Sequence, residues 1–270
     1  MNNFEGKTVL LTGAFGLFGR EISKAFLENG ANVILAGHNI EKIKIGEKDI
    51  TDNYNSDRFL ICQLELCNIT SIEDCVRESI KKFHSIDILI NNAAVDAKFD
   101  AKNLSKTDLS RFENFPVEKL RSSIEINMLG TIRMTQVVCK QMLKQGHGNI
   151  INVGSIYSII APNKALYDFG NDENAFKPVD YVVSKSFIPN FTRYVAVYYA
   201  KEGIRCNAIA PHGVYDNHDK NFVTNFSKLS PVGRMCKKEE LGGPFLFLAS
   251  DSSSYLNGHT LVLDGGWTAW

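Results

Sequence analysis

Tyr181 and Lys185 are separated by four positions, which places a phenol and an amine on the same face of a helix, one turn apart. A free tyrosine has a pKa of about 10, whereas proton transfer at neutral pH is most effective when the pKa lies nearer 7. An ammonium group beside the phenol stabilises the phenolate and so lowers this pKa. The pair is typical of a general acid/base, although the same spacing also occurs on solvated helix faces.

A glycine-rich segment near the start of the chain predicts a binding site for a pyrophosphate. It reads Thr12-Gly13-Ala14-Phe15-Gly16-Leu17-Phe18-Gly19 and separates an apolar run from an amphipathic stretch. Glycines allow a tight turn and a close approach of the backbone, and the helix that follows offers unpaired N–H groups. The alternative is a structural turn without a ligand. The residues expected to contact a dinucleotide are Gly13, Phe15, Gly16, Leu17 and Phe18.

The residue after the second apolar run indicates which nicotinamide cofactor is bound. An acid at this place binds the ribose 2′-hydroxyl of NAD, and a base accommodates the 2′-phosphate of NADP. The sequence here is Ala36-Gly37-His38-Asn39, which contains no acid and one imidazole. An imidazole is neutral for much of the time near pH 7, so the signal is blurred. We expect NADP or NAD, with a small preference for NADP that depends on His38.

The elements that must position these residues alternate short apolar runs with longer amphipathic stretches. Continuous apolar runs are typical of strands buried on both faces, and their alternation with helices predicts a doubly wound parallel sheet. About seven strands and one α/β domain over residues 1–270 are expected. The expected strands are 7–12, 32–36, 58–63, 87–91, 149–153, 204–210 and 260–263, and the expected helices are 17–29, 69–83, 117–144, 179–201 and 237–250. Residues 158–177 and 212–228 interrupt the alternation after strand ends, where such sheets bind ligands.

The overall composition excludes several classes of function. Lysine plus arginine number 30 and aspartate plus glutamate number 30, so the basic excess of nucleic-acid-binding proteins is missing. Apolar runs fall far short of the roughly 20 residues of a membrane span, and the first residues lack a signal-peptide core. The six cysteines have no metal-binding spacing. We expect a cytoplasmic protein with reduced thiols and no nucleic-acid, membrane or metal partner.

Further polar groups follow the expected elements: Asn91-Asn92-Ala93-Ala94, Asn127 within the helix 117–144, and Ser155 after the strand 149–153. Together with the glycine-rich segment, the tyrosine–lysine pair and the ending Asp264-Gly265-Gly266-Trp267, their order and spacing resemble the short-chain dehydrogenase/reductase family. The resemblance covers nearly the whole chain and points to the compact single-domain branch. It implies a Rossmann-like fold and an NAD(P)-dependent oxidoreductase that transfers a hydride between the cofactor and a secondary alcohol or ketone.

The resemblance also implies roles for individual residues. Tyr181 is implied to be the general acid/base on the substrate oxygen, and Ser155 to polarise that oxygen. Lys185 is implied to bind the nicotinamide ribose and to lower the tyrosine pKa, and Asn127 to anchor a water that links Lys185 to solvent. The other implied cofactor contacts are Glu65 and Leu66 at the adenine, Asn92 in the groove and Val214 behind the nicotinamide carboxamide, beside Tyr181 and Lys185.

The sequence departs from the family pattern in three smaller features. The glycines are spaced T-G-x-x-G-x-x-G, which is more similar to the extended branch of epimerases and dehydratases. His212 separates Pro211 from Gly213, and both a partly exposed loop imidazole and a hydrogen bond to substrate are open interpretations. Pro189 lies inside the helix 179–201, where it removes the N–H that would bond to the Lys185 carbonyl and predicts a kink.

The largest departure is an insertion at residues 158–177, which places Tyr181 26 positions after Ser155. Long loops in compact domains are more often functional than decorative. The insertion leaves one expected catalytic residue and returns at another, and its polar side chains suit hydroxyl groups. We therefore expect a lid over a sugar or nucleotide-sugar derivative, with packing on a neighbouring subunit as the alternative. The insertion resembles that of bacterial members linked to flagellin-glycan and nonulosonic-acid pathways.

Two other functions stay open at this point. The glycine spacing favours a nucleotide-sugar epimerase or dehydratase, whereas the intact set of four polar residues disfavours a non-catalytic cofactor sensor. A homotetramer is also expected, because the helices 117–144 and 179–201 carry more apolar surface than the sheet covers. The family resemblance points the same way, with these helices pairing across a two-fold axis. The side chains expected on that surface are Val137, Val138, Tyr194, Val195, Tyr198 and Tyr199.

Overall fold

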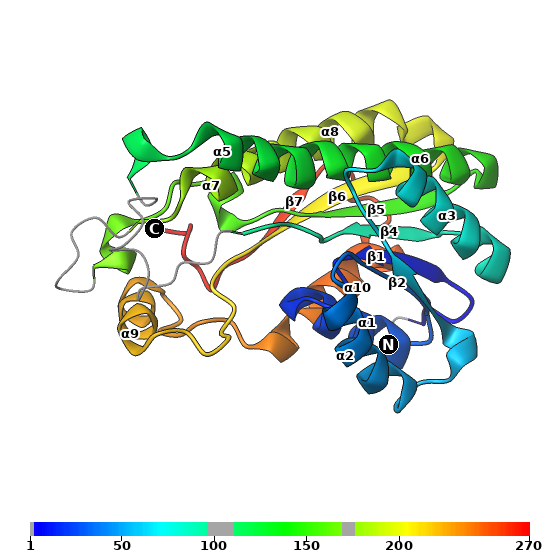
Figure 1. The fold of residues 1–270 in the computed structure, drawn as a ribbon, viewed down its shortest axis with the longest axis horizontal. Helices are drawn as coiled ribbons and strands as arrows, with labels where there is room; N and C mark the ends of the chain where they lie inside the picture. Colours follow the sequence, from blue (N-terminus) through cyan, green and yellow to red (C-terminus); the bar gives the residue numbers. More distant parts are fainter. Residues whose placement is uncertain (1–2, 97–110, 169–175) are drawn as a thin grey trace.

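Parallel β-strands form the central layer of the molecule, with helices on both faces (Figure 1). The computed structural model describes residues 3–96, 111–168 and 176–270. Within these ranges the sheet has seven strands: β1 (Thr8–Thr12), β2 (Asn32–Gly37), β3 (Phe59–Gln63), β4 (Ile88–Asn91), β5 (Gly148–Val153), β6 (Ile204–Pro211) and β7 (Thr260–Leu263). Each end lies within one residue of the expected end, and the predicted fold class is confirmed.

The strand order is β3-β2-β1-β4-β5-β6-β7, and every pairing is parallel. The chain winds outward from β1 to β3 and then continues on the other side of β1, beginning with β4. In a sheet of this kind the reversal leaves a crevice outside the carboxyl ends of the strands. The glycine-rich segment follows β1, and Asn92 follows β4, so both lie at this reversal.

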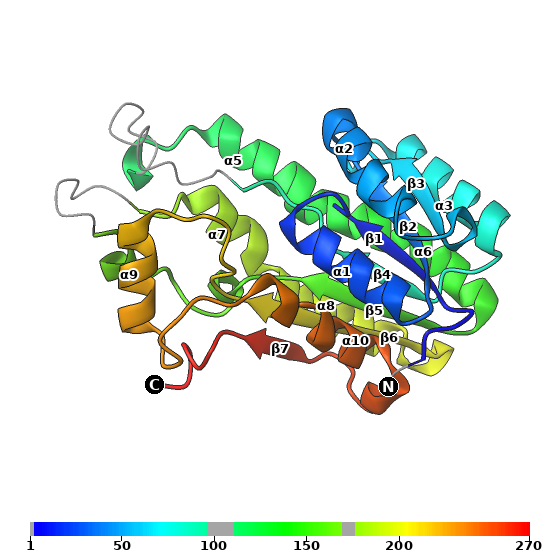
Figure 2. The same ribbon diagram turned by 90° about the horizontal axis from the view of Figure 1, so that it is seen from below.

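Each face of the sheet has its own set of helices, as Figure 2 shows from a second direction. Leu10 lies in the core on one face and Leu11 in the core on the other, and both are fully buried. Successive side chains of a strand point to opposite faces, so a sheet covered on both sides needs continuous apolar strands. The covering helices are α3 (Ile69–Phe83), α6 (Thr131–Gln145) and α8 (Ile188–Tyr198) on the first face, and α1 (Leu17–Glu28), α2 (Ile40–Thr51) and α10 (Gly242–Ala249) on the second.

Two helices are missing from the sequence-based prediction: α2 and α9 (Lys220–Leu229). Each begins at a capping side chain, because Asn39 accepts a hydrogen bond from the backbone N–H of Lys42 and Asp219 accepts one from that of Asn221. Both helices are rich in polar residues and much of their surface is exposed, and they were not recognised from the sequence. The expectation of an irregular segment over 212–228 is wrong where α9 forms.

The expected long helices are interrupted close to the site. Residues 117–144 comprise α5 (Val117–Ser123), a π-helical turn at Ile124–Gly130 and α6. Residues 179–201 comprise α7 (Val179–Ser186) and α8, with the break at Phe187, just before Pro189. This break agrees with the kink expected from proline. The expected helix 237–250 is a 3₁₀ turn followed by the shorter α10.

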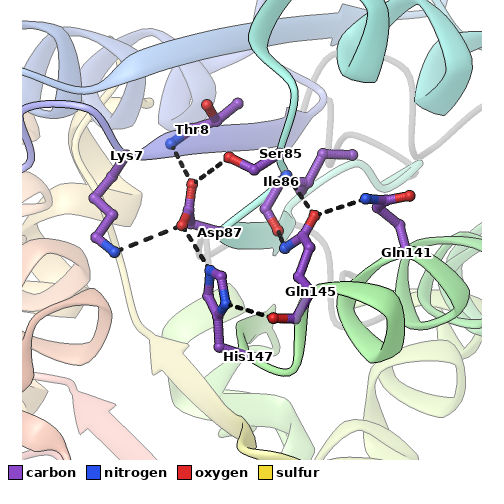
Figure 3. Close-up of polar contacts among 8 residues, drawn as sticks. All are labelled: Lys7, Thr8, Ser85, Ile86, Asp87, Gln141, Gln145 and His147. Carbon is purple, nitrogen blue, oxygen red and sulfur yellow. Dashed lines mark hydrogen bonds and ion pairs between the residues drawn. The ribbon is translucent and has the colours of Figure 1, made fainter.

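A polar network lies at the amino end of β4, opposite to the crevice at the carboxyl ends of the strands (Figure 3). Oδ2 of Asp87 accepts hydrogen bonds from the Thr8 backbone N–H at 2.9 Å and from the Ser85 hydroxyl at 3.0 Å. Oδ1 lies 3.0 Å from Nε2 of His147 and 3.6 Å from Nζ of Lys7. Burial raises the pKa of Asp87, but these partners outweigh burial and hold the pKa below its usual range. The carboxylate thus ties β1, β4 and the turn before β5 together.

Candidate active site

A cleft of about 630 Å³ lies where the strand order reverses. The segments that follow β1, β2, β3, β4 and β5 line this cleft, and α7 contributes two side chains. The structure brings all of the expected cofactor contacts except Val214 into this one cleft. They are Gly13, Phe15, Gly16, Leu17, Phe18, His38, Glu65, Leu66, Asn92, Tyr181 and Lys185.

The glycines of the first turn are required by close backbone contacts. Gly13 has a φ of +68°, and a Cβ at this position would lie 2.8 Å from Cα of Ala93. A Cβ at Gly19 would lie 2.2 Å from the carbonyl oxygen of Gly13. The turn can therefore pass close beneath a ligand, and α1 can begin directly after it. Gly16 is the N-cap of α1, and within the described chain no side chain caps this helix, so its first N–H groups are available to an anion.

The unusual glycine spacing has a packing explanation. The ring of Phe15 is buried against two glycines: a Cβ at Gly37 would lie 2.7 Å from it and a Cβ at Gly46 would lie 2.5 Å from it. The ring fills the space between β2 and α2. The spacing thus accommodates an aromatic side chain and does not by itself indicate an epimerase or a dehydratase.

Asn92 joins the carboxyl ends of β1 and β4 beneath the cleft. Its Nδ2 donates to the carbonyl oxygens of Thr12 and Gly13 at 3.0 and 3.1 Å. Its backbone N–H donates to the Thr12 hydroxyl at 3.0 Å, as does that of Ala93. These bonds fix the shape of the glycine turn, so Asn92 both lines the cleft and supports its floor.

His38, Lys42 and Glu65 line the cleft beside the start of α2. Nδ1 of His38 is hydrogen-bonded to the carboxylate of Glu65, and both side chains are largely exposed. Lys42 lies in the first turn of α2 and was missed because that helix was missed. A lysine and an imidazole can bind a 2′-phosphate, whereas the glutamate brings a negative charge to the same place.

Tyr181, Ser155 and Lys185 meet beside the carboxyl end of β5. The side chains of Ser155 and Tyr181 are hydrogen-bonded, and Nζ of Lys185 donates to the carbonyl oxygen of Val153 at 2.6 Å. Burial lowers the pKa of Lys185 to about 8. Desolvation by the surrounding protein raises the pKa of Tyr181, and the hydrogen bond with Ser155 opposes that rise. A phenol, a hydroxyl and an ammonium in this arrangement can exchange a proton with an alcohol oxygen.

Ser158 replaces the hydrogen bond that Pro189 removes. Its hydroxyl donates to the carbonyl oxygen of Lys185 at 2.9 Å and accepts a bond from the Ser155 backbone N–H at 3.0 Å. Without this hydroxyl, the buried carbonyl near the proline would lose a partner. Ser158 thus fixes Lys185 and Ser155 relative to each other.

Asn127 lies in the π-helical turn and is 1% exposed. Its Nδ2 donates to the carbonyl oxygen of Val95 at 2.9 Å and to the hydroxyl of Ser184 at 2.8 Å. Its Oδ1 accepts from the backbone N–H of Val95 at 2.8 Å. The side chain thereby ties the segment after β4 to α7. Its amide is occupied by protein partners, which leaves the backbone carbonyl, already bonded to Thr131, as a place to hold a water.

The described part of the insertion packs inside its own chain. Leu166 and Tyr167 are buried in a small cluster with α9, where the Tyr167 and Phe222 ring centroids are 6.0 Å apart. The Tyr167 hydroxyl lies 3.0 Å from the hydroxyl of Tyr157. Lys177, at the end of the insertion, lies over the ring of Tyr181, with Nζ 4.3 Å from its centroid. Residues 169–175 of the expected lid lie outside the described residues.

His212 is 7% exposed and is packed among aromatic rings. Its ring centroid lies 4.5 Å from that of Trp267 and 4.9 Å from that of Phe226. Burial lowers the pKa of His212 to about 4, although the carboxylate of Asp264 acts in the opposite direction. The interpretation as a partly exposed loop imidazole is therefore wrong.

Val214 is not among the described residues that line the cleft; it forms a parallel bridge with Cys236, whereas Pro211 from the same segment does line it. The role of Val214 behind the nicotinamide carboxamide stays a prediction. Asp96, which follows β4, lines the cleft but was not predicted. Nothing in the local sequence identifies Asp96 as a site residue, because only the folded chain brings it near Tyr181.

The described residues contain neither a candidate metal site nor a membrane-spanning helix. Among the described residues, no cluster of three or more histidine, cysteine, aspartate or glutamate side chains could hold a metal ion. Among the same residues, no helix has both the length and the apolar character needed to cross a bilayer.

Comparisons with known proteins agree with this geometry over almost the whole chain. A family profile described as enoyl-(acyl carrier protein) reductase matches residues 13–268. An NAD-dependent glycerol dehydrogenase from Listeria innocua is 31% identical over 98% of this chain and 95% of its own. A 2-dehydro-3-deoxy-D-gluconate 5-dehydrogenase from Dickeya dadantii is 30% identical over 99% of this chain and 97% of its own. A post-translational flagellin modification protein A from Campylobacter coli is 28% identical over 97% of this chain and 98% of its own.

A solved structure shows the same arrangement of elements. The short-chain dehydrogenase from Leptospira borgpetersenii with bound NAD⁺ superposes with a TM-score of 0.83. It is 30% identical, and the match covers 98% of this chain and 94% of that one. The family profile, which begins just after β1, covers the segments that line the cleft, the tyrosine–lysine pair and the other six strands, and these relatives match over almost the whole chain. The chain therefore belongs to the short-chain dehydrogenase/reductase family of NAD(P)-dependent oxidoreductases.

Proposed function

We propose that the protein interconverts a secondary alcohol and a ketone in a polyol, a sugar or a nucleotide-sugar derivative. The observation that carries this proposal is the meeting of Tyr181, Ser155 and Lys185 at a cleft that the glycine turn also lines. The names of two relatives, a glycerol dehydrogenase and a 2-dehydro-3-deoxy-D-gluconate dehydrogenase, support a hydroxyl-rich substrate.

The cleft fits a nicotinamide dinucleotide. The turn at Gly13 leaves no room for a Cβ, and the N–H groups at the start of α1 suit a pyrophosphate. Lys185 is placed to bind ribose hydroxyls, and His38 with Lys42 is placed to bind a 2′-phosphate, which supports a preference for NADP. When bound, the nicotinamide ring supplies or accepts the hydride.

In this mechanism Tyr181 holds and moves the proton of the substrate oxygen. Its phenolate accepts the hydroxyl proton during oxidation, and its phenol returns a proton during reduction. Ser155 donates a hydrogen bond to the same oxygen and so orients it. The hydrogen bond with Ser155 opposes the rise in the Tyr181 pKa that desolvation causes, and the positive charge of Lys185 is proposed to act in the same direction. Asn127 keeps α7 in place and holds, through its backbone, the water that connects Lys185 to solvent.

The insertion is proposed to cover the substrate. Ser158, at its start, bonds to the backbone of Ser155 and Lys185, and Lys177, at its end, lies over Tyr181. Closure of such a segment excludes water from the reacting groups. The proposal also includes a cytoplasmic location, supported by six free cysteine thiols, and a homotetrameric assembly, argued in the Discussion.

The test is a panel of polyols, sugar acids, free sugars and nucleotide sugars, each incubated with NAD⁺ or NADP⁺. Oxidation is followed as the absorbance of the reduced nicotinamide. A substrate that yields a ketone together with stoichiometric reduced cofactor is the expected result. Turnover without net change in added cofactor would instead identify an epimerase or dehydratase.

Tyr181→Phe is the matched variant for this panel. It removes one hydroxyl and keeps the ring, so we expect kcat to fall by at least roughly 10²–10⁴-fold while cofactor affinity changes little. Fluorescence titration with the reduced cofactor measures that affinity. Retained turnover in this variant would contradict the assignment of Tyr181.

A further inference from the structure

An ion pair lies directly against the proposed acid/base. Nζ of Lys177 is 2.5 Å from Oδ1 of Asp96, and the lysine side chain is 9% exposed. The same ammonium lies 4.3 Å from the ring centroid of Tyr181. Lys177 comes from the end of the insertion and Asp96 from the segment after β4, so the pair joins two parts of the chain that are 81 positions apart.

The carboxylate of Asp96 is the member of the pair that faces the cleft. Asp96 lines the cleft and its side chain is 43% exposed, whereas Lys177 is nearly buried and does not line it. The negative charge of Asp96 acts on Tyr181, Lys185 and Tyr157, which places it beside the reacting groups. Asp96 therefore lies in the cleft, close to the proposed catalytic residues.

The chemistry of the pair suits a neutral hydroxyl group. An ionised carboxylate is an acceptor with two oxygens, and Oδ1 of Asp96 already binds the ammonium of Lys177. The lysine fixes the carboxylate and offsets its charge, which leaves Oδ2 as an acceptor directed by a rigid partner. An anionic group of a substrate would meet this carboxylate before it met the shielded lysine. Oδ2 of Asp96 therefore favours binding of an uncharged hydroxyl group over binding of a carboxylate or a phosphate beside it.

We propose that Asp96, positioned by Lys177, selects substrates that carry a second hydroxyl on a carbon next to the one that is oxidised. The proposal rests on the proposed oxidoreductase function and names its substrate class, an alcohol with a neighbouring diol hydroxyl. The reacting oxygen binds Tyr181 and Ser155, and the neighbouring hydroxyl donates to Asp96. Lys177 acts as a positioning residue, because it reaches the substrate through the carboxylate.

The experiment compares two alcohols that differ by the neighbouring hydroxyl. One is the best polyol of the panel, and the other is its analogue without that hydroxyl; propane-1,2-diol and propan-2-ol form such a pair for three carbons. For the wild-type protein we expect kcat/KM to be at least about tenfold higher for the polyol, as for a hydrogen bond to a charged group. In Asp96→Ala this ratio should fall to within about threefold, because the rate on the polyol falls while the rate on the analogue is kept.

Variants of Lys177 and two matched controls complete the test. Lys177→Met keeps the packing over the Tyr181 ring but frees the carboxylate, so the ratio should fall by about threefold or more, mainly through KM. Lys177→Arg keeps the ion pair and should restore it. Lys81→Met, on the exposed surface of α3, and Asp57→Ala, outside the cleft lining, should leave the ratio unchanged.

The outcomes separate this proposal from the proposed function. If the wild-type protein produces no reduced nicotinamide with any member of the panel, the proposed function fails. If it does, but Asp96→Ala keeps the wild-type ratio or loses both activities equally, the role of Asp96 in selection is overturned. Asp96→Asn keeps an oxygen acceptor and a similar shape, so it provides the ratio if Asp96→Ala does not fold. Its ratio should lie between those of Asp96→Ala and the wild type, and a ratio equal to that of the wild type counts against the proposal.

Discussion

Buried charges around Tyr181 determine how easily its phenol exchanges a proton. Burial lowers the pKa of Lys185 to about 8, so its ammonium stays largely protonated at neutral pH. The carboxylate of Asp96 raises the pKa of both Lys185 and Tyr181, and the ammonium of Lys177 lies against Asp96 and over the Tyr181 ring, where its charge opposes that of the carboxylate. The site therefore balances one carboxylate against two ammonium groups, and a bound oxidised nicotinamide would add a further positive charge.

Cofactor preference is expected to depend on His38. An imidazole can donate a hydrogen bond to a 2′-phosphate, so the kcat/KM ratio of NADP to NAD should exceed one for the wild type. His38→Asp places an acid where a 2′-hydroxyl is bound, so the ratio should shift toward NAD by about tenfold or more. Steady-state rates with both cofactors at pH 6, 7 and 8 measure this, with His84→Asn as the control on an exposed histidine. Equal or better use of NAD by the wild type across this range would refute the preference.

His212 is expected to make the folded protein sensitive to mild acid. Its pKa is lowered by burial to about 4, so between pH 6.5 and 4 the unfolded chain binds a proton that the folded chain does not. Stability should therefore fall with pH in this window, by ~2 kcal/mol between pH 7.5 and 5. His212→Phe keeps a ring among the aromatic neighbours and should remove that part of the loss. Urea unfolding of both proteins at the two pH values gives the comparison, and identical losses would argue against a neutral buried imidazole.

Residues whose roles depend on local spacing could be predicted from the sequence. The glycine turn and the pair Tyr181 and Lys185 are examples, because a turn and a helix fix their geometry within a few positions. Asp96 and Lys177 could not be found in this way, since 81 positions separate them and only the folded chain brings them together. Lys42 was missed for a different reason, namely that its helix was not recognised.

Interruptions of regular helices position the catalytic side chains. The π-helical turn carries Asn127, and the break at Phe187 frees the Lys185 carbonyl for Ser158. Extra or missing backbone bonds of this kind often mark functional sites, because they direct a side chain that a regular helix would place elsewhere. The proline was a visible signal of the break, whereas the π turn has no sequence signature that we recognise.

The start of β4 is expected to depend on Asp87. Asp87→Asn keeps the shape but removes the charge that accepts bonds from Thr8, Ser85 and His147, so stability at pH 7 should fall by about 1–3 kcal/mol. The pKa of Asp87 is lowered in the folded state, so its contribution is present above the usual carboxyl value and is lost as the pH falls below it. Thermal unfolding at pH 7 and pH 3 tests both points.

The control for Asp87 is Asp57→Asn, at an exposed position outside the network. It should leave the free energy of unfolding within about 0.5 kcal/mol of the wild type. If Asp87→Asn behaved like this control at neutral pH, the network in Figure 3 would have no measurable effect on stability.

The strands were predicted to within one residue and the helices less well, for physical reasons. Strands buried on both faces are short, continuous apolar runs, which leave a clear mark in the sequence. α2 and α9 begin at the caps Asn39 and Asp219, but their apolar side chains pack against elements that only the fold brings near, so tertiary contacts decide their existence.

At the scale of the molecule, only some of the side chains that were expected to form an oligomer interface are exposed in the folded chain. Val137 and Val138 on α6 and Val195 on α8 are buried in the core. The expectation that these three side chains are exposed is therefore wrong. Tyr194 and Tyr198 are 64% and 61% exposed on α8, with their rings stacked at 5.8 Å between centroids. A helix that is apolar on nearly every side does not reveal from sequence which residues the sheet will cover.

We expect the protein to self-associate through the outer surface of α8. Val197 is 81% exposed between the two stacked tyrosines, so this face leaves apolar groups in water that a second copy can cover across a two-fold axis. We expect a homotetramer in light scattering at micromolar concentration. Val197→Glu should shift it to dimers or monomers, because association would place two charges near the axis. Ile45→Glu, which changes an equally apolar exposed position on α2, should leave the mass unchanged. A wild-type monomer, or a Val197→Glu tetramer, would show that α8 does not mediate assembly.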